Sequence, residues 1–348
     1  MRLNEAVIEH HRVSRIPTYK LKKQVALNEA YLKEKPDWYM VDGKLQYFKI
    51  RNDFRLFTEQ FFSMYGREIL GLDAVDYHVA YVRTKDPVLK STEEVTKCGL
   101  LSESFQDLQA NNYYLISELM NAQISDLIHF GGYTLETLLK FFKQYLVEED
   151  YNIMELFLIT QFIGDGFTHQ EDRNPHNISV NIPKIPGVTY TERLHPDVLA
   201  KKKKGKDFLF LNRDGQYQLK GLRPTKVYDN ERILGVDHKN VFAYKKGLIW
   251  APLLSYDEDT KFASEEDALK VSQKYYSGLD PNLLSVYMEY PEICTPIFER
   301  LAYDDEYRRI LERFDGKTTQ IALSTDEMEY VTMVLKDKQK VFSDILHY

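Results

Sequence analysis

The chain has 348 residues, 43% hydrophobic and 28% charged, a composition typical of a folded globular protein and not of a disordered one. Its formal net charge of −7 argues against direct nucleic-acid binding, which usually needs a basic face. The two cysteines, Cys98 and Cys294, exclude a disulfide framework and a thiolate zinc site, and fit a reducing, cytoplasmic setting. No signal peptide is recognisable, and no apolar run approaches the roughly 20 residues of a spanning helix, so we expect a soluble protein without a membrane span.

The first third of the chain reads as strands around one helix. Residues 38–50 alternate apolar and polar side chains on both sides of an Asp-Gly pair, which predicts a β-hairpin. Residues 53–70 carry phenylalanines at helical spacing, which predicts a helix. Residues 74–83 and 111–120 are expected to be strands.

From about residue 121 the pattern becomes mainly helical. Residues 134–146 have one apolar face, and residues 152–163 are apolar nearly all round except for Glu155, which predicts a central buried helix. Residues 208–222 read as a second hairpin, and the chain from 264 onward reads as helical again.

These patterns predict an α+β fold of two lobes. The smaller, strand-rich N-lobe would comprise residues 1–120, with ATP-anchoring strands and one helix, and the larger, helical C-lobe would comprise residues 121–348.

Residues 169–180, HQEDRNPHNISV, form a polar loop directly after the apolar helix. Asp172 and Asn177 stand five residues apart in it, a spacing that is weak evidence alone because Asp and Asn are common in loops. Phosphoryl transfer needs a Lys for the ATP phosphates, an acid that holds this Lys, a loop Asp for the acceptor hydroxyl, and an Asn and a second Asp for Mg²⁺. Lys49, Glu59, Asp172, Asn177 and Asp257 supply these parts in that order.

Each part also has a simpler interpretation. Lys49 alone is better read as an exposed strand residue. Glu59 lies beside large apolar residues on the predicted helix, where an unpaired carboxylate would cost several kcal/mol and an ion pair with Lys49 would relieve that cost. The alternative for Glu59 is a solvated residue on the helix surface. Asp257 and Asp259 follow the strand and proline of LIWAPLL, and the alternative for them is a solvated acidic turn.

Five segments resemble the HipA-like protein kinases, closest to the smaller CtkA-like members without a separate N-terminal subdomain. YFKI resembles the strand with the ATP-anchoring Lys, and TEQFFSMYGREILGLDAVDYHVA the acid-bearing helix and the strand after it. GLLSESF resembles a recurrent segment, FIGDGFTHQEDRNPHNISV the catalytic loop, and APLLSYDED the metal-binding segment. The resemblance implies a catalytic loop at 165–180, an inserted segment at 181–248 and a metal-binding segment at 249–260.

By this resemblance Asp172 is the catalytic Asp, Asn177 and Asp257 are the Mg²⁺ ligands, Lys49 is the phosphate Lys, and Asp165 is a supporting acid.

Further candidates follow from the same comparison. His176 and Asp259 are supporting residues of the loop and of the metal segment. Backbone groups of Glu118 or Met120 are expected to contact the adenine at a hinge between the lobes. Ser14 is a candidate for phosphate contact and for autophosphorylation.

The sequence also departs from the family pattern. Asn174 stands where His is usual, and Asp257 follows Pro252 by five residues instead of three. No glycine-rich phosphate loop is visible; the segment around Ser14, Arg15 and Lys20 is the substitute, with a basic surface loop as the alternative.

The expected function is that of an ATP- and Mg²⁺-dependent serine/threonine protein kinase that autophosphorylates. Its partners would be a protein substrate and, by family analogy alone, an antitoxin-like protein. Two alternatives stay open: a catalytically dead kinase fold that serves as a binding module, and a kinase acting on a lipid or another small molecule. Secretion into a host cell is an alternative to the cytoplasm.

Overall fold

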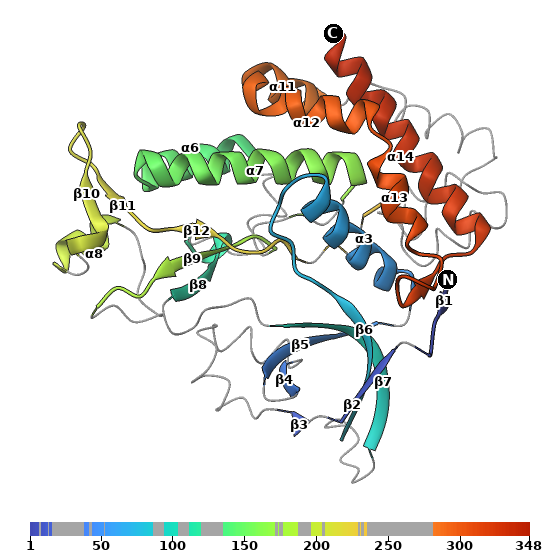
Figure 1. Ribbon diagram of the computed structural model, residues 1–348. Coiled ribbons are helices and arrows are strands. Elements are labelled where there is room, and N and C mark those ends of the chain that lie inside the picture. Colours follow the sequence, from blue (N-terminus) through green and yellow to red (C-terminus); the bar gives the residue numbers. More distant parts are fainter. Residues whose placement is uncertain are drawn as a thin grey trace, which may run out of the picture.

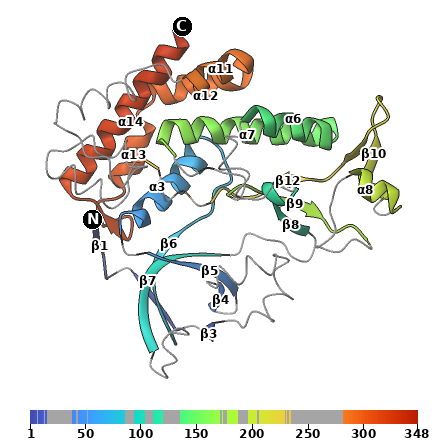
Figure 2. The ribbon, with the colours of Figure 1, turned by 180° about the vertical axis from the view of Figure 1, so that it is seen from behind.

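The computed structural model describes residues 1–6, 8–12, 14–15, 38–41, 44–51, 53–85, 94–103, 111–119, 135–170, 173, 177–186, 196–203, 206–228, 230, 233–234 and 281–348. This part of the chain is a mixed α+β fold, as predicted. Most helices gather on one side of the molecule and the largest sheet lies on the other, with helix α3 (Arg55–Glu68) between them (Figure 1; Figure 2 shows the same layers from behind).

The largest sheet has six strands in the order β2-β6-β7-β5-β4-β3. Their bounds are β2 Glu9–Arg12, β3 Ser14–Arg15, β4 Trp38–Val41, β5 Lys44–Ile50, β6 His78–Lys85 and β7 Glu94–Glu103. Strand β2 runs parallel to β6, and the other pairs are antiparallel. Strands β4 and β5 pair with Val41 opposite Lys44, so the hairpin predicted from the Asp-Gly pair is confirmed.

The register of this sheet decides which face each side chain occupies. Lys49 on β5 pairs with Leu100 on β7, which pairs with Val79 on β6. The neighbouring row contains His78, which pairs with Leu101. Because successive side chains of a strand point to opposite faces, Lys49 and His78 lie on opposite faces of the sheet.

Helix α3 confirms the helix predicted over residues 53–70. Asp53 precedes it, and its Oδ1 accepts the backbone N–H of Arg55 at 3.0 Å, which satisfies one donor of the first turn. The helix packs by its aromatic rings: the ring of Phe57 meets that of Phe314 edge-on with centroids 4.8 Å apart. Ten of its residues are buried, so α3 is a core element.

A second sheet of three strands has the order β12-β9-β8. Its strands are β8 Asn111–Leu115, β9 Ser179–Pro183 and β12 Arg223–Pro224. Among the described strands, β8 pairs only with β9. The short helix α4 (Ile116–Leu119) follows β8, so the strand expected over 111–120 ends at Leu115. The domain border near residue 120 stays a prediction.

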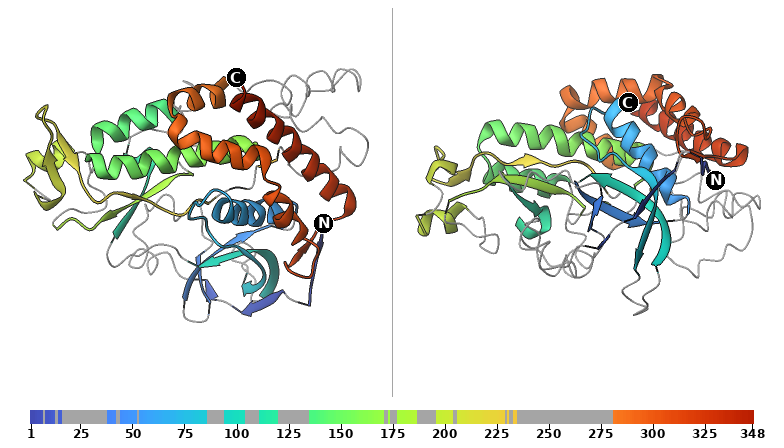
Figure 3. Two further views of the ribbon diagram at one scale, coloured as in Figure 1. Left: turned by 45° about the horizontal axis from the view of Figure 1, so that its top comes forward. Right: turned by 60° about the horizontal axis from the view of Figure 1, so that its bottom comes forward.

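The segment between β9 and β12 contains a second hairpin. Strands β10 (Leu209–Leu211) and β11 (Tyr217–Leu219) pair as predicted over residues 208–222. With α8 (Pro196–Lys201) and the 3₁₀ turn η1 (Lys206–Phe208) they form a projection at one end of the molecule (Figures 1 and 3).

The helical layer begins with α6 (Leu135–Tyr145) and α7 (Glu148–Thr168), which pack against each other. The expectation of a helix buried all round is wrong for α7. Ile153 is 38% exposed and Leu156 is 52% exposed, because neighbouring elements cover the opposite side of the helix.

Asp150 in the first turn of α7 is fully buried and accepts from Arg223 and from the backbone N–H of Gly221. An ion pair and a backbone donor together offset the cost of burying its charge. No local signal in the sequence indicated this pair, because its partners are more than 70 residues apart.

The remaining helices form the C-terminal part of the layer: α11 Pro281–Glu289, α12 Pro291–Tyr303, α13 Glu306–Glu312 and α14 Thr325–Leu346. The turn before α14 returns to the N-terminal end of the chain, where β13 (Ile321–Ala322) pairs with β1 (Arg2–Leu3). No helix among the described residues combines the length and the apolar character that crossing a membrane requires.

The C-terminal helices hold the end of α3. The guanidinium of Arg300 on α12 donates to the carbonyl oxygens of Ile69 at 2.6 Å and Glu68 at 3.0 Å. Arg313, just after α13, pairs with the Glu68 carboxylate through two contacts of 2.6 Å. Cations at a helix C-terminus satisfy its unpaired carbonyls and favour its dipole. The tail of the chain therefore positions α3, the helix on which Glu59 lies.

Candidate functional site

Lys49 and Glu59 form an ion pair between β5 and α3. The Nζ atom of Lys49 donates to Oε1 of Glu59 at 2.6 Å. The Lys49 side chain is 10% exposed and that of Glu59 is fully buried. The ion pair predicted from the sequence is thus present, and the interpretation of Glu59 as a solvated helix residue is excluded.

The second carboxylate oxygen of Glu59 reaches a distant part of the chain. Oε2 accepts the backbone N–H of Asn230 at 2.8 Å, across 171 residues of sequence. Both oxygens of this buried carboxylate are therefore satisfied, as burial of a charge requires. Asn230 follows β12 by six residues, so Glu59 links helix α3 to the segment after β12.

Arg173, in the polar loop after α7, forms a second group of polar contacts besides those of Glu59. Its Nε and Nη2 atoms donate to the two carboxylate oxygens of Asp165 at 2.9 and 3.0 Å. Its Nη1 donates to the carbonyl of Tyr228 at 2.9 Å, and Nη2 also donates to Oδ1 of Asn230 at 2.6 Å. A planar guanidinium suits such a fixed set of acceptors better than the point charge of a lysine.

Asp165 is a buried acid at the C-terminal end of α7. Burial raises its pKa above the ordinary value, and the charge and hydrogen bonds of Arg173 oppose that rise. The same burial raises the pKa of Tyr65 on α3, with Asp165 as a second cause. Asp165 thus lies in the last turn of α7, where its partner is Arg173, so residues 165–168 of the predicted catalytic loop are helical and the supporting role of Asp165 stays a prediction.

Asn230 joins the two sets of contacts, since its backbone binds Glu59 and its side chain binds Arg173. The guanidinium carbon of Arg173 also lies 5.9 Å from the ring centre of Phe62 on α3. One chain of polar contacts therefore runs from Lys49 through Glu59, Asn230 and Arg173 to Asp165. It connects the six-stranded sheet, α3, the segment after β12, the polar loop and α7.

The polar loop begins with a left-handed residue. His169 ends α7 with φ of 53°, and its backbone N–H donates to the carbonyl of Asp165. Left-handed backbone is uncommon outside glycine, and histidine is among the residues enriched there. The loop ends near Asn177, which is 8% exposed and directly precedes Ile178, whose carbonyl accepts the backbone N–H of Ile116 at 3.0 Å. Asn177 is thus a buried polar residue beside β9 and the end of β8.

A cavity of about 580 Å³ adjoins the start of the loop. This volume lies within the range of roughly 300–1,000 Å³ usual for ligand pockets. Its described lining comes from α6, α7, α11, α14 and the loop, and includes Gln161, Asp165, His169 and Arg173. Among the described residues, Oε1 of Gln161 has no hydrogen-bond partner although it is buried.

Several predicted site residues lie outside the described residues: Met120, Asp172, His176, Asp257 and Asp259. The backbone of Glu118 lies in α4, and its side chain is outside the description. Ser14 lies in β3, where its backbone pairs with Met40. The stretch predicted as a phosphate loop is therefore β-strand at Ser14 and Arg15, and all these functional roles stay predictions.

Arg173, Tyr228 and Asn230 are not among the site residues predicted from the sequence. A signal was present: the chain contains the spacing Pro-x₃-Tyr-Asp twice, ending at Asp229 and at Asp257. The second copy, in APLLSYDED, is the one that the family resemblance selected. Tyr228 and Asn230, the neighbours of Asp229, both contact Arg173, so the first copy is the one that the described contacts bring to the polar loop.

Comparison with known proteins gives likenesses in structure alone. No family model and no curated protein matches the chain. The solved structure of the proinflammatory kinase CtkA from Helicobacter pylori matches with a TM-score of 0.47 and 13% identity, over 90% of this chain and 95% of that one. A chain from the complex of the Shewanella oneidensis MR-1 toxin–antitoxin system HipA, HipB and its operator DNA matches with a TM-score of 0.39 and 12% identity, over 87% of this chain and 59% of that one. Both names agree with the resemblance that the motifs suggested.

Proposed function

We propose that this chain transfers the γ-phosphoryl group of ATP, with Mg²⁺, to a serine or threonine hydroxyl of a protein. The observation that supports this most is the buried Lys49–Glu59 pair together with its connection, through Asn230 and Arg173, to the polar loop. A lysine fixed by a helix acid, next to a loop with Asp and Asn, is the arrangement that phosphoryl transfer requires. In this proposal the six-stranded sheet and α3 belong to the smaller lobe, and the nucleotide binds between it and the helical lobe.

The residues present fit the nucleotide and the metal by their chemistry. Lys49 is a fixed cation for phosphate oxygens. Asn177 supplies an amide oxygen and Asp229 or Asp257 a carboxylate, which are the hard oxygen ligands that Mg²⁺ prefers. When bound, Mg²⁺ would neutralise charge on the phosphates.

In the proposed reaction Asp172 accepts the proton of the acceptor hydroxyl. The hydroxyl oxygen forms a bond to the γ-phosphorus, the bond between that phosphorus and the β–γ bridging oxygen breaks, and ADP leaves. Lys49 holds the phosphates in position, Glu59 holds Lys49, and Asp165 with Arg173 holds the start of the loop that contains Asp172. Fixed groups of this kind contribute through orientation and electrostatic stabilisation.

We propose Asp229 as the carboxylate ligand of the metal, in preference to Asp257 and Asp259. The support is the position of its two neighbours in the sequence, Tyr228 and Asn230, in contact with Arg173. Asp257 remains the alternative from the family resemblance.

Incubation with γ-labelled ATP and Mg²⁺, followed by mass spectrometry of phosphosites, tests the proposal. We expect label on the wild type or on an added protein substrate, and none with Asp172→Ala. Loss of transfer in Asp229→Ala but not in Asp257→Ala would assign the metal ligand, and label on Ser14 would identify the autophosphorylation site. Transfer that persists in Asp172→Ala contradicts the mechanism.

The same preparation separates the rival functions. ATP binding without transfer to any protein or to the chain itself would favour the binding module. Transfer to a lipid or a small hydroxyl compound alone would favour the second alternative. The exposed acid Asp214 in the turn between β10 and β11 provides a control, because Asp214→Asn should leave both binding and transfer unchanged.

A further inference from the structure

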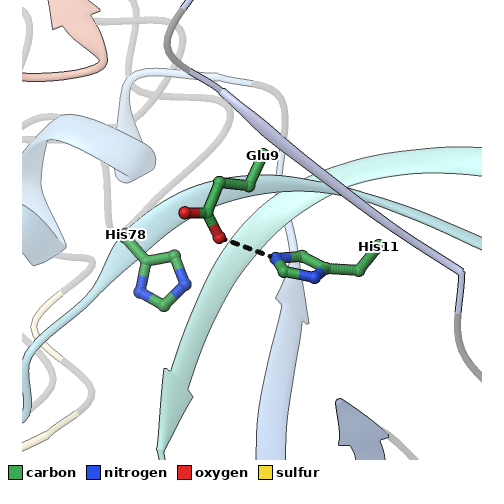
Figure 4. A group of neighbouring side chains, drawn as sticks. All are labelled: Glu9, His11 and His78. Carbon is green, nitrogen blue, oxygen red and sulfur yellow. Dashed lines mark ion pairs between the residues drawn. The ribbon is translucent and has the colours of Figure 1, made fainter. Parts of the chain in front are cut away.

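Three metal-ligating side chains meet on the six-stranded sheet, away from the proposed catalytic site. Glu9 and His11 lie on β2, and His78 begins β6. Glu9 is paired with Ala80, so residues 9 and 11 of β2 and residues 78 and 80 of β6 have their side chains on the same face. Figure 4 shows the carboxylate of Glu9 between the two imidazole rings.

The donor atoms are near the spacing of a metal site. One ligand atom from each of the three residues lies within 4.8 Å of the others. Oε2 of Glu9 and Nε2 of His11 are 3.1 Å apart. Tetrahedral Zn²⁺ with bonds of about 2.0–2.1 Å to nitrogen and oxygen separates its ligands by roughly 3.3 Å. The Glu9–His11 pair is close to that separation, and the ligand atom of His78 lies within 4.8 Å of both.

The nature of the donors selects the class of metal. Two imidazoles and one carboxylate suit Zn²⁺ and other divalent transition metals, whereas Mg²⁺ and Ca²⁺ prefer oxygen ligands alone. Three protein ligands leave a fourth position for water or another group. An ordinary surface ion pair explains Glu9 and His11, but it does not explain why a second histidine from another strand faces the same point.

The surroundings favour a defined site. His11 is 13% exposed in its side chain, while Glu9 is 65% exposed, so solvent reaches the group from one side. A fully buried apolar cluster lies on the same face of the sheet and consists of Phe48, Ala80, Val82 and Leu101. An apolar surround limits solvent access and lowers the local dielectric constant at a metal site.

We propose that Glu9, His11 and His78 bind one divalent transition-metal ion that joins β2 to β6. The site lies on the face of the sheet opposite Lys49, so it is separate from the Mg²⁺ site of the proposed reaction. The metal would anchor the strand that leads, three residues after His11, to Ser14. It would therefore act on the position of the N-terminal segment and not on the transferred phosphoryl group.

Titration of untagged, chelator-treated protein with Zn²⁺ in a calorimeter tests this proposal. We expect one equivalent to bind to the wild type in the presence of excess Mg²⁺. His78→Ala and His11→Ala should each weaken binding by more than about 100-fold, since loss of a direct ligand exceeds the 10- to 100-fold cost of removing an outer partner. His347→Ala, in an exposed histidine at the end of α14, should bind as the wild type does.

Two further measurements keep the result unambiguous. Co²⁺ in place of Zn²⁺ should give the intense visible absorption of a four-coordinate site, and this absorption should be lost in His78→Ala. Glu9→Gln keeps the shape of the side chain and should weaken binding without unfolding the protein, as circular dichroism would show. Absence of a stoichiometric Zn²⁺ site, or unchanged affinity in both His11→Ala and His78→Ala, would overturn the proposal.

Discussion

Lys49 and Glu59 are joined by a 2.6 Å ion pair, and the same carboxylate accepts the backbone N–H of Asn230. A single buried side chain thus fixes a strand residue on one side and the segment after β12 on the other. Because a carboxylate in such a position is costly unless both oxygens are paired, the pair specifies the relative placement of β5, α3 and residue 230.

Removal of one partner of this pair should destabilise the protein more than removal of both. Glu59→Leu removes the carboxylate that pairs with the buried Lys49 and accepts from Asn230, and we expect a loss of about 3–5 kcal/mol in the free energy of unfolding. The double variant Lys49→Met/Glu59→Leu should recover much of that loss, while phosphoryl transfer stays absent in both. Urea denaturation measures the first effect and labelled ATP the second.

The exposed pair of Glu136 and Lys140 on α6 provides the matched control for this cycle. Glu136→Leu should change the free energy of unfolding by no more than about 0.5 kcal/mol. Equal stability losses in the Glu59→Leu single variant and in the double variant would contradict a buried ion pair.

Arg173 is expected to act as a positioning residue for the polar loop. Arg173→Lys keeps the charge but loses the fork that reaches Asp165, Tyr228 and Asn230 together. A displacement of about 1 Å in the loop should lower kcat by about 100-fold. Steady-state kinetics with ATP measure this, and Arg213→Lys in the exposed turn between β10 and β11 should have wild-type kinetics.

Gly99 on β7 is required by the close approach of β5. A Cβ atom at this position would lie 2.3 Å from the carbonyl oxygen of Lys49 and 2.9 Å from the ring of Phe48. Since the nearest atom belongs to the backbone, Gly99→Ala must displace β5 and with it the Lys49 side chain. We expect lower thermal stability and weaker ATP binding, measured by calorimetry.

Gly215 in the turn between β10 and β11 is a useful comparison for Gly99. A Cβ atom there has no neighbour within 4 Å, although its φ of 77° makes substitution locally strained. Gly215→Ala should reduce stability without any change in ATP affinity. An ATP affinity that is unchanged in Gly99→Ala would show that β5 does not shift.

The contact between Glu68 and Arg313 should make part of the stability depend on pH. Hydrogen bonds from Arg313 lower the pKa of Glu68 below its usual value of 4.5. An acid whose pKa is lowered in the folded state contributes stability above its unfolded pKa, and this contribution is lost as the pH falls through the folded value. The Arg313 side chain is 37% exposed and that of Glu68 is 42% exposed, so the pair contributes at most about 1 kcal/mol to the free energy of unfolding.

Glu68→Gln tests this contribution directly. The melting temperature of the variant should lie below that of the wild type at pH 7, and the two should converge at acidic pH, once the carboxyl group of the folded wild type is protonated. A difference that is the same at both pH values would mean that the ionised carboxylate is not what holds Arg313 to α3.

Elements specified by local chemistry could be predicted from the sequence. The Asp-Gly pair predicted the β4–β5 hairpin, and the spacing of phenylalanines predicted α3. The Lys49–Glu59 pair was also predictable, because its two members are only ten residues apart on adjacent predicted elements and an unpaired acid among apolar residues needs a partner.

Contacts between distant segments could not be predicted in this way. The sequence contains two Pro-x₃-Tyr-Asp segments, and only the folded chain brings the neighbours of Asp229 to Arg173. Likewise, the segment of α7 is apolar nearly all round and does not show which of its sides is covered, and Leu156 is exposed.

By itself, the sequence determined the hairpins, the main helices and the pairing of one lysine with one acid, since these depend on turn residues, periodicity and short separations along the chain. The tertiary structure alone decided that Asn230 and Arg173 connect this pair to the polar loop, that the tail helices hold α3, and that Glu9, His11 and His78 share one face. Each of these features depends on the packing of segments that are far apart in the sequence. The free energy gained by burying side chains determines that packing, and local sequence patterns do not encode it.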